Sequence, residues 1–422
     1  MSPKLPRLLY LSDVTPEKSF HGSVLLHRLL GNYPTEKLLV IESNLYPSKP
    51  QRRLPGVRYE TLQEGWPRPL HTRFARTYHT WLTLTAATRA KQIKPLLRGF
   101  EPEAVLTVTY FYAWLTAAEF ASRQGLPLHL ILHDECVEAP FVVESFKPRL
   151  RRMFGEIYRK AAARLCVSPY MAKEYKQKYG THGDVLYPSR ASDATVFDRP
   201  PDRLLQSREQ TELVVAFGGT LGSIGGMRLL ALIAEALKPL HGVLIIFGPV
   251  DPVHARANGL DAANIVFKGS LEPEAFKRAL REEADVLLVP MPFELQNATN
   301  ARISFPSKLA DYTAVGLAIL IFGPKYCSGV RWAEDNAPVA EVVTRQELGD
   351  ITDALKRLNR REHRLKLALA ALQKGGEYFG HAAIETRFFS YLHGHVSEKI
   401  DPPLALVATE TCGSSSSQRG SE

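Results

Sequence analysis

A glycine-rich segment between an apolar run and a helical pattern is the first candidate for chemistry. It reads GGTLGSIGG over residues 218–226 and completes the run ELVVAFG. Glycines let a backbone pass close to a ligand, and N–H groups at a helix start can face phosphate oxygens. We therefore predict that Gly219, Thr220 and Gly222 bind the phosphates of a nucleotide. The alternative is a flexible turn that serves packing alone.

The spacing of these glycines disfavours two common nucleotide-binding classes. Thr220 occupies the place of the second glycine in G-x-G-x-x-G, and no glycine is followed by Lys-Ser or Lys-Thr at the offset of a P-loop. The sequence therefore argues against a dinucleotide dehydrogenase and against a P-loop NTPase.

The segment FPSKLADYTAVGLAIL, residues 305–320, is the second candidate. Pro306 suits the first turn of a helix, where the N–H groups of Ser307 and Lys308 would be unpaired beside an ammonium group. That combination suits a diphosphate. Asp311, one turn further along the same face, could accept hydrogen bonds from two ribose hydroxyls. The alternative is an ordinary surface ion pair between Lys308 and Asp311, worth about 0.2–0.5 kcal/mol.

Three polar residues, His133, Asp134 and Glu135, end another apolar run. A histidine can donate to a hydroxyl or pair with developing phosphate charge. Asp134 or Glu135 could act as a general base, which an inverting transfer needs and a retaining one does not. A histidine at a strand end also commonly makes a purely structural hydrogen bond.

Apolar runs and amphipathic stretches alternate along nearly the whole chain, and these runs are the expected strands. They are RLLYLS, KLLVIE, GVRYE, AVLTVT, LHLILH, RLCVS and DVLY, then ELVVAFG, GVLIIFG, NIVFKG, DVLLVPM, LAILIF and PVAEVV. Runs of this length spaced by helices indicate parallel strands that are buried on both faces. They predict an α/β protein of two Rossmann-like domains, which bind ligands where the carboxyl ends of the strands face a cleft.

The expected boundaries follow from composition. We predict an N-terminal acceptor domain at 1–188, a polar linker at 189–212 and a C-terminal nucleotide-sugar domain at 213–378. A helix at 379–398 would pack back on the N-terminal domain, and a Ser-rich disordered tail would follow at 399–422. Within the first domain, residues 69–97 are expected to form a long helical stretch.

Charge is unevenly distributed along the chain, whose net charge is +9. Residues 1–188 have 27 basic and 16 acidic side chains, and residues 49–98 have 11 basic and 2 acidic ones. This segment also contains Trp66, Phe74, Tyr78 and Trp81. We expect an anionic membrane surface as a partner, with a solvated face or a protein partner as the alternatives, whereas nucleic acid is not expected because no readout motif accompanies the charge.

Cysteine usage and hydropathy indicate the compartment. The four cysteines form no CxxC pair, and no apolar stretch approaches the ~20 residues of a membrane span. We expect a cytoplasmic protein, with a peripheral place on the inner face of the membrane as an extension.

Over most of residues 5–395, and most strongly at 264–322, the chain resembles the retaining, metal-independent GT-B glycosyltransferases, of the group 1 or family 4-like kind. The segment 305–317 is similar to their P-S-K-L-x-E-Y-x-A-x-G-x-P helix, and residues 264–290 to the segment that ends in A-D-V-x-L-x-P. The resemblance implies a UDP- or GDP-sugar donor, no cofactor and no metal. It also implies that His133 touches the transferred sugar or a donor phosphate, and that Gly22 lets its loop approach phosphate or acceptor. Ser23 beside it could be a helix N-cap instead.

Two departures from that family concern the donor site. Its members often have two glutamates separated by seven residues, whereas this chain has Ile303 and Asp311 at those positions. Many members also supply Arg and Lys beside the glycine loop, where this chain has no cation. Asn297, Asn300 and Arg302 could substitute.

The expected function is transfer of a hexose-type sugar from a nucleoside diphosphate sugar to a hydroxyl of a glycan, lipid-linked or small-molecule acceptor. Two alternatives stay open at this point. One is a GT-B epimerase or phosphorylase, and the other is a degenerate glycosyltransferase that binds a partner protein.

Overall fold

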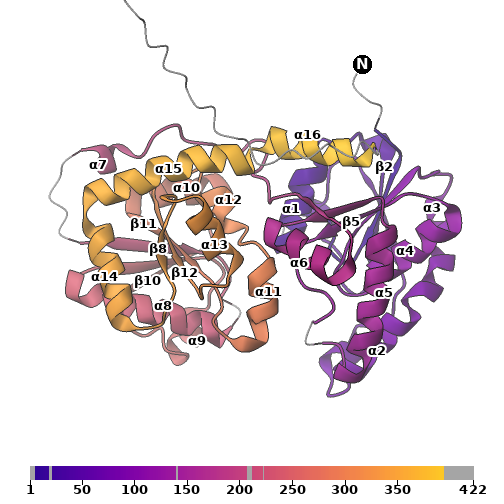
Figure 1. Cartoon of the computed structure of the whole chain (residues 1–422), viewed down its shortest axis with the longest axis horizontal. Helices are drawn as coiled ribbons and strands as arrows, with labels where there is room; N and C mark the ends of the chain where they lie inside the picture. The colour runs from indigo at the N-terminus through magenta and orange to yellow at the C-terminus, as the bar shows by residue number, and fades with distance from the viewer. Residues whose placement is uncertain (1–4, 19–20, 139–140, 207–211, 222, 394–422) are drawn as a thin grey trace, which may run out of the picture.

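The computed structural model describes residues 5–18, 21–138, 141–206, 212–221 and 223–393. It has two lobes that lie side by side, and each lobe is built around its own parallel sheet (Figure 1). We call them the N-lobe and the C-lobe.

The N-lobe sheet has the strand order β3-β2-β1-β4-β5-β6-β7, and all its pairings are parallel. Its strands are β1 (Leu8–Ser12), β2 (Leu38–Ser43), β3 (Arg58–Leu62), β4 (Ala104–Val108), β5 (Leu128–Leu132), β6 (Ala163–Cys166) and β7 (Asp184–Val185). The central strands β1, β4 and β5 are buried along their whole length, as expected for strands covered on both faces.

Helices cover both faces of this sheet. They are α1 (His21–Leu30), α2 (Ala75–Thr85), α3 (Ile93–Leu97), α4 (Ala113–Gln124), α5 (Lys147–Lys160) and α6 (Pro169–Tyr179). The stretch 69–97 is helical over most of its length, as expected, but it is divided into η3 (Arg68–His71), α2, η4 (Ala86–Gln92) and α3 and does not form one continuous helix. Threonine hydroxyls at 83, 85 and 88 bond to carbonyls of the preceding turn, a habit that weakens a helix interior.

The C-lobe sheet repeats the same order as β10-β9-β8-β11-β12-β13. Its strands are β8 (Val214–Gly218), β9 (Val243–Phe247), β10 (Ile265–Gly269), β11 (Val286–Pro290), β12 (Ala318–Phe322) and β13 (Glu341–Val343). The helices of this half are α7 (Asp202–Leu205), α8 (Ile224–Leu237), α9 (Pro252–Ala257), α10 (Pro273–Glu283), α11 (Ala298–Ile303), α12 (Lys308–Tyr312), α13 (Ser328–Asp335), α14 (Leu348–Asn359), α15 (Arg361–Phe379) and α16 (His381–Leu392). Each of the runs expected as strands overlaps one of the thirteen strands that the described residues form.

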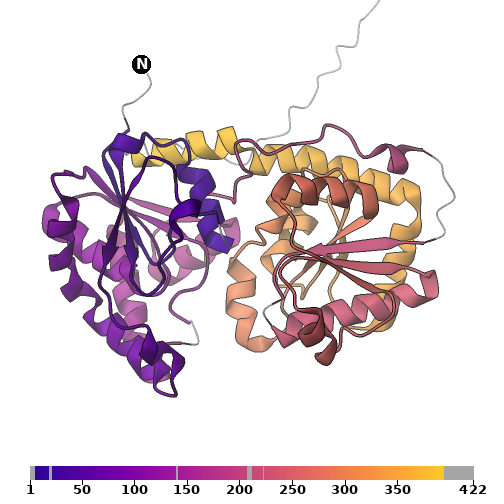
Figure 2. The same cartoon turned by 180° about the vertical axis from the view of Figure 1, so that it is seen from behind.

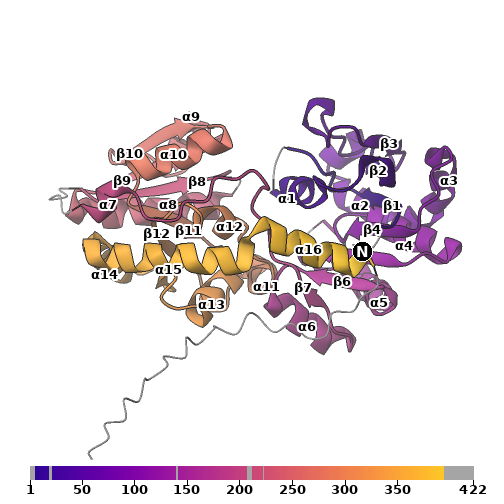
Figure 3. The same cartoon turned by 90° about the horizontal axis from the view of Figure 1, so that it is seen from above.

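The last two helices cross from one lobe to the other. Figures 2 and 3 show α15 along the C-lobe and α16 continuing over the N-lobe. There Phe389 meets Tyr33 edge to face at 5.7 Å, and Asn32 donates to Glu385 over 2.9 Å. The C-terminal helix therefore fastens the two lobes together.

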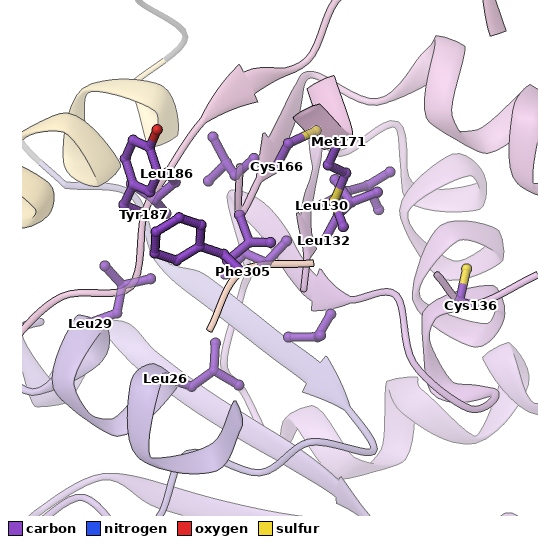
Figure 4. Packing of buried hydrophobic residues seen from close by; sticks show 14 of the residues in the cluster. Leu26, Leu29, Leu130, Leu132, Cys136, Cys166, Met171, Leu186, Tyr187 and Phe305 are labelled. Atoms are coloured by element: carbon purple, nitrogen blue, oxygen red, sulfur yellow. The ribbon is translucent and has the colours of Figure 1, made fainter. Parts of the chain in front are cut away.

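An aromatic side chain of the C-lobe also packs in the N-lobe core. Phe305 lies beside Tyr187, with ring centroids 5.1 Å apart, and near Leu26 and Leu29 of α1 (Figure 4). It immediately precedes the segment expected to bind a diphosphate. The packing of the two lobes therefore fixes the position of that segment.

Candidate active site

The two sheets bring their carboxyl ends to the interface between the lobes. In both sheets the strand order reverses beside the first strand of the lobe. This happens between β1 and β4 in the N-lobe and between β8 and β11 in the C-lobe. Ligands of doubly wound sheets bind at this reversal point. The cavities described next lie there in each lobe.

The predicted donor residues come together in one cavity of ≈ 350 Å³. Gly219, Thr220, Ser307, Lys308 and Asp311 all line it, and we call it the Lys308 cavity. The sixth predicted residue, glycine 222, lies outside the described residues. The cavity therefore joins the glycine loop to the segment that precedes α12.

Lys308 contacts the glycine loop directly. The backbone at Gly219 has φ 144°, and a Cβ placed there would lie 2.7 Å from Cε and 2.9 Å from Nζ of Lys308. The ammonium lies 5.2 Å from the ring centroid of Phe217. Burial lowers the pKa of Lys308, since leaving water disfavours its charged form. A desolvated cation in a cavity wall is suited to bind an anion.

The helix expected to begin at Pro306 begins later and is short. It comprises Lys308–Tyr312, while the N–H of Leu309 bonds to the carbonyl of Pro306 over 3.0 Å. So short a helix has little macrodipole, which grows with aligned peptides. The positive charge in this cavity therefore belongs to side chains.

Arg28 supplies a second cation that sequence reasoning missed. It lies on α1 of the N-lobe, lines the Lys308 cavity and places Nη2 3.2 Å from Asp311. Its Nη1 donates to the carbonyl of Ser189 over 3.0 Å. No local sequence signal identifies this arginine, because its partner is 283 residues away.

The far end of the Lys308 cavity is apolar. Phe247, Pro249, Leu271 and Phe276 contribute to its walls. Gly248 is required there, because φ is 133° and a Cβ would lie 2.2 Å from the carbonyl oxygen of Gly219. Apolar walls of this kind suit a flat, largely apolar group.

A second cavity of ≈ 360 Å³ shares Thr220 and Lys308 with the first, and Asn297 at the end of η7 (Leu295–Asn297) and Asn300 of α11 also line it. We call it the Asn300 cavity. Arg302 does not line it, because that side chain extends toward Glu174, 3.9 Å away. Of the three expected substitutes, the two asparagines thus face a cavity.

The residue at 303 does not face either cavity. Ile303 is fully buried, and its carbonyl accepts a hydrogen bond of 2.5 Å from Ser168, the N-cap of α6. α11 packs against α6 of the N-lobe. The position of the family's first glutamate is therefore part of the lobe interface in this chain.

The residues expected on the acceptor side line a cavity of ≈ 430 Å³ in the N-lobe. Gly22, Ser23 and His133 all border it, and we call it the His133 cavity. A Cβ at Gly22 would lie 3.5 Å from Nδ1 of His133. Burial lowers the pKa of His133, partly offset by the charge of Asp134, so the imidazole is neutral at pH 7. It can therefore donate to, or accept from, a hydroxyl.

The two carboxylates after His133 differ in setting. Asp134 borders the His133 cavity and accepts a hydrogen bond of 3.0 Å from Asn300 of the C-lobe. Glu135 is buried and is held by the N–H of Val137 and by Lys178. Only Asp134 of this pair is in a position to meet an acceptor, and Asn300 links the cavities of the two lobes.

The basic segment 49–98 is not one continuous patch. Arg89 is buried beside Glu64, and Arg53 pairs with Glu42 at 2.7 Å. The end of the N-lobe formed by η3 and α2 differs, because Trp66, Phe74 and Trp81 are 72%, 60% and 45% exposed there. Arg73 lies over the ring of Phe74 at 4.8 Å.

Two further properties concern the described part of the chain. None of its helices is both long and apolar enough to cross a bilayer. No three of its His, Cys, Asp or Glu side chains gather as metal ligands would.

Comparisons with known proteins bear on this arrangement. Residues 46–188 match the model of Glycosyltransferase Family 4. No curated protein matches the chain. Among solved structures, Anabaena HepE in complex with UDP and glucose is similar with a TM-score of 0.63 and 14% identity, covering 92% of this chain and 99% of that one.

Two other solved structures are similar over nearly the same length. Sucrose-phosphate synthase from Thermosynechococcus elongatus has a TM-score of 0.61 at 16% identity, covering 91% and 97% of the two chains. An E. coli trehalose-6-phosphate structure bound with UDP-2-fluoro glucose has a TM-score of 0.60 at 12% identity, covering 91% and 98%. These likenesses confirm the expected architecture, the GT-B fold of glycosyltransferases.

Proposed function

We propose that this protein is a glycosyltransferase that moves a hexose-type sugar from a nucleoside diphosphate sugar to an acceptor hydroxyl. The observation that carries the proposal is the Lys308 cavity, where a desolvated ammonium, the glycine loop and Asp311 lie along one wall. The UDP-containing structures that share this fold support the choice of a nucleotide-sugar donor.

The donor is expected to span the two C-lobe cavities. The base would lie against the apolar end near Phe247, the ribose would bond to Asp311, and the diphosphate would meet Lys308. The sugar would then enter the Asn300 cavity, where Asn297 and Asn300 present amide groups to its hydroxyls. Amides both donate and accept, which suits a polyhydroxylated ring.

The transfer needs stabilisation of the leaving diphosphate. The bond between the anomeric carbon and the phosphate oxygen breaks, and the acceptor oxygen forms the new bond to that carbon. In a retaining transfer the hydroxyl proton passes to the departing phosphate oxygen. Lys308 and the N–H groups of the glycine loop would balance the charge that develops there, so we propose a metal-independent and retaining reaction.

His133 is proposed to hold the reacting end of the acceptor or donor. It borders the N-lobe cavity opposite the donor, and its neutral ring can orient a hydroxyl. His133→Ala should lower turnover more than nucleotide affinity. Full turnover of that variant, or its failure to fold, would favour a structural role.

Product analysis separates the proposal from its alternatives. UDP-glucose, UDP-GlcNAc and GDP-mannose are incubated with the protein and an acceptor pool, and nucleotide release is followed. Release that depends on acceptor supports transfer, whereas sugar interconversion without release identifies an epimerase. A folded protein that releases nothing and binds no nucleotide would be a degenerate binding module, and the proposal would be wrong.

We further propose that the N-lobe attaches to an anionic membrane from the cytoplasmic side, through η3 and α2. The exposed Trp66, Phe74 and Trp81 can enter the interfacial region. Arg68 and Arg73 would each add about 1 kcal/mol against anionic lipid.

Vesicle co-sedimentation tests this attachment. Binding to phosphatidylglycerol vesicles should weaken with salt and should be lost when Arg68, Arg73 and Arg76 are changed to Glu. Arg345→Glu, an exposed change on the C-lobe, is the matched control and should leave binding nearly unaltered. Absence of binding at low salt would refute membrane attachment while leaving the transfer proposal intact.

A further inference from the structure

The turn that follows β4 holds a phenylalanine in a strained backbone conformation. Phe111 has φ 48°, in the left-handed region that residues with a Cβ seldom adopt. The N–H of Tyr110 bonds back to the carbonyl of Val108 over 2.8 Å, so the chain reverses within three residues. Such strain persists only where the surroundings enforce it, and it concentrates at functional sites.

A buried carboxyl group enforces this turn. Oδ2 of Asp13 accepts hydrogen bonds from the N–H groups of Tyr112 and Ala113, over 2.8 and 2.7 Å, at the start of α4. Burial raises the pKa of both Asp13 and the neighbouring Glu64, and Arg89 lies 3.9 Å from Glu64. Asp13 thus positions the turn.

The strained turn places two rings on one wall of the His133 cavity. Phe111 stacks on Tyr46 with ring centroids 4.5 Å apart and an interplanar angle of 7°, and Tyr110 meets Phe111 at 4.4 Å. All three rings border the cavity and are half-buried. The adjacent Tyr112, by contrast, is completely buried in the core. We call Tyr46, Tyr110 and Phe111 the aromatic shelf.

The cavity also presents polar groups. Ser23, His133 and Asp134 border it together with the aromatic shelf, and its volume is ≈ 430 Å³. A hydrocarbon chain bound there would desolvate these polar groups without replacing their hydrogen bonds, which is costly. A pyranose has an apolar C–H face and a rim of hydroxyls, so it satisfies both kinds of wall.

We infer that the aromatic shelf is an acceptor subsite that binds a saccharide, with the C–H face of a pyranose ring packed against the side of the stacked Phe111–Tyr46 pair that borders the cavity. The inference rests on the proposed transfer function, which it deepens by naming the class of acceptor. Hydroxyls at the rim of the ring would meet Asp134 and His133, on the side that faces Asn300 of the C-lobe.

Saturation-transfer NMR with methyl glycosides tests the subsite. The probes are methyl glucoside, methyl galactoside, methyl mannoside and the methyl glycoside of N-acetylglucosamine, each added to the UDP-saturated protein. At least one should receive saturation at the ring protons of one face. In Phe111→Gly, which accepts φ 48° without strain and removes only the ring, its affinity should fall about tenfold, as for 1.4 kcal/mol. Tyr46→Ala should behave alike.

The matched control is Leu369→Ala, which removes an exposed apolar side chain of α15 outside the cavity. Glycoside and UDP affinities should both be unchanged in it, and UDP affinity should also be unchanged in Phe111→Gly. The subsite is refuted if UDP binds but no glycoside does, if farnesyl phosphate binds in place of every glycoside, or if Phe111→Gly binds glycoside like the wild type. Failure to bind UDP would instead refute the donor site.

Discussion

Removal of the ion pair between Arg28 and Asp311 should weaken nucleotide binding and reveal that the two residues act together. Nη2 of Arg28 lies 3.2 Å from both carboxylate oxygens. At an effective dielectric constant of about 20 the attraction is about 5 kcal/mol, most of which desolvation offsets. The net contribution of the pair is then at most that of a charged hydrogen bond, about 1.5–3 kcal/mol. The side chains are 16% and 34% exposed, so we expect the lower half of that range.

The perturbation is a double-mutant cycle of Arg28→Ala, Asp311→Ala and the double variant, with UDP and GDP titrated calorimetrically. Arg28→Ala removes a cation from the cavity wall and leaves the carboxylate unoriented, so affinity should fall about fivefold to thirtyfold, or about 1–2 kcal/mol. Asp311→Ala should cost about 1–3 kcal/mol through its lost ribose bonds.

The diagnostic quantity is the coupling energy. Because Arg28 acts through Asp311, the double variant should be little worse than Asp311→Ala, and the coupling should exceed about 0.5 kcal/mol. Arg345→Ala is the control, since that arginine forms an exposed pair with Asp350 away from the cavities. Strictly additive losses, or an unaltered affinity in Arg28→Ala, would refute the reasoning.

Three other changes have defined outcomes. Gly219→Ala places a methyl group 2.7 Å from Lys308 Cε at φ 144°. UDP affinity should therefore fall about tenfold, and the free energy of unfolding should fall by about 1 kcal/mol. Calorimetry checks the affinity and urea titration checks the stability; an unchanged affinity would contradict the contact. Ile303→Glu buries a charge in the lobe interface and should cost about 3 kcal/mol or more rather than restore a sugar contact, so a stable, more active variant would refute this placement. Burial lowers the pKa of His129 to about 4 in the folded protein. As pH falls below 6.5, this histidine is therefore protonated in the unfolded chain before it is protonated in the folded protein. Stability should decline by about 3 kcal/mol between pH 6.5 and 4 in urea titrations, and His129→Leu should lack this contribution; identical pH profiles would refute it.

The sheets were predictable because their signal is local. Apolar runs such as LAILIF are short, contiguous and buried on both faces, so composition and spacing suffice to find them. The two Rossmann-like halves and their shared cleft follow from that alternation. The broken helix near Thr85 was not predictable, because its hydroxyl contacts with nearby carbonyls compete with an otherwise helical pattern.

Site residues were predictable where chemistry and position coincide in one segment. Lys308 and Gly219 each follow a recognisable local pattern, and the structure brings them into contact. Arg28 and Asn300 escaped full assignment because their partners are on the other lobe. Phe111 gave no signal at all, since its conformation depends on Asp13, far away in sequence.

Ile303 shows that a residue at a motif position in the sequence need not lie in the site. The spacing from Asp311 matches the family's pair of acidic residues, yet α11 turns this side chain into the lobe interface. Packing between domains decides which face of a short helix meets the ligand. A single sequence contains that information only through many weak contacts.

Calorimetric titration of UDP and GDP into the wild-type protein and into Lys308→Ala tests the central claim most directly. Lys366→Ala, an exposed change on α15 of the same lobe, serves as the matched control. We predict that at least one nucleotide binds the wild type and the control equally, and that Lys308→Ala loses about 1.5–3 kcal/mol of binding free energy while remaining folded. Equal affinity of Lys308→Ala and the wild type, or no binding of either nucleotide, would contradict the account.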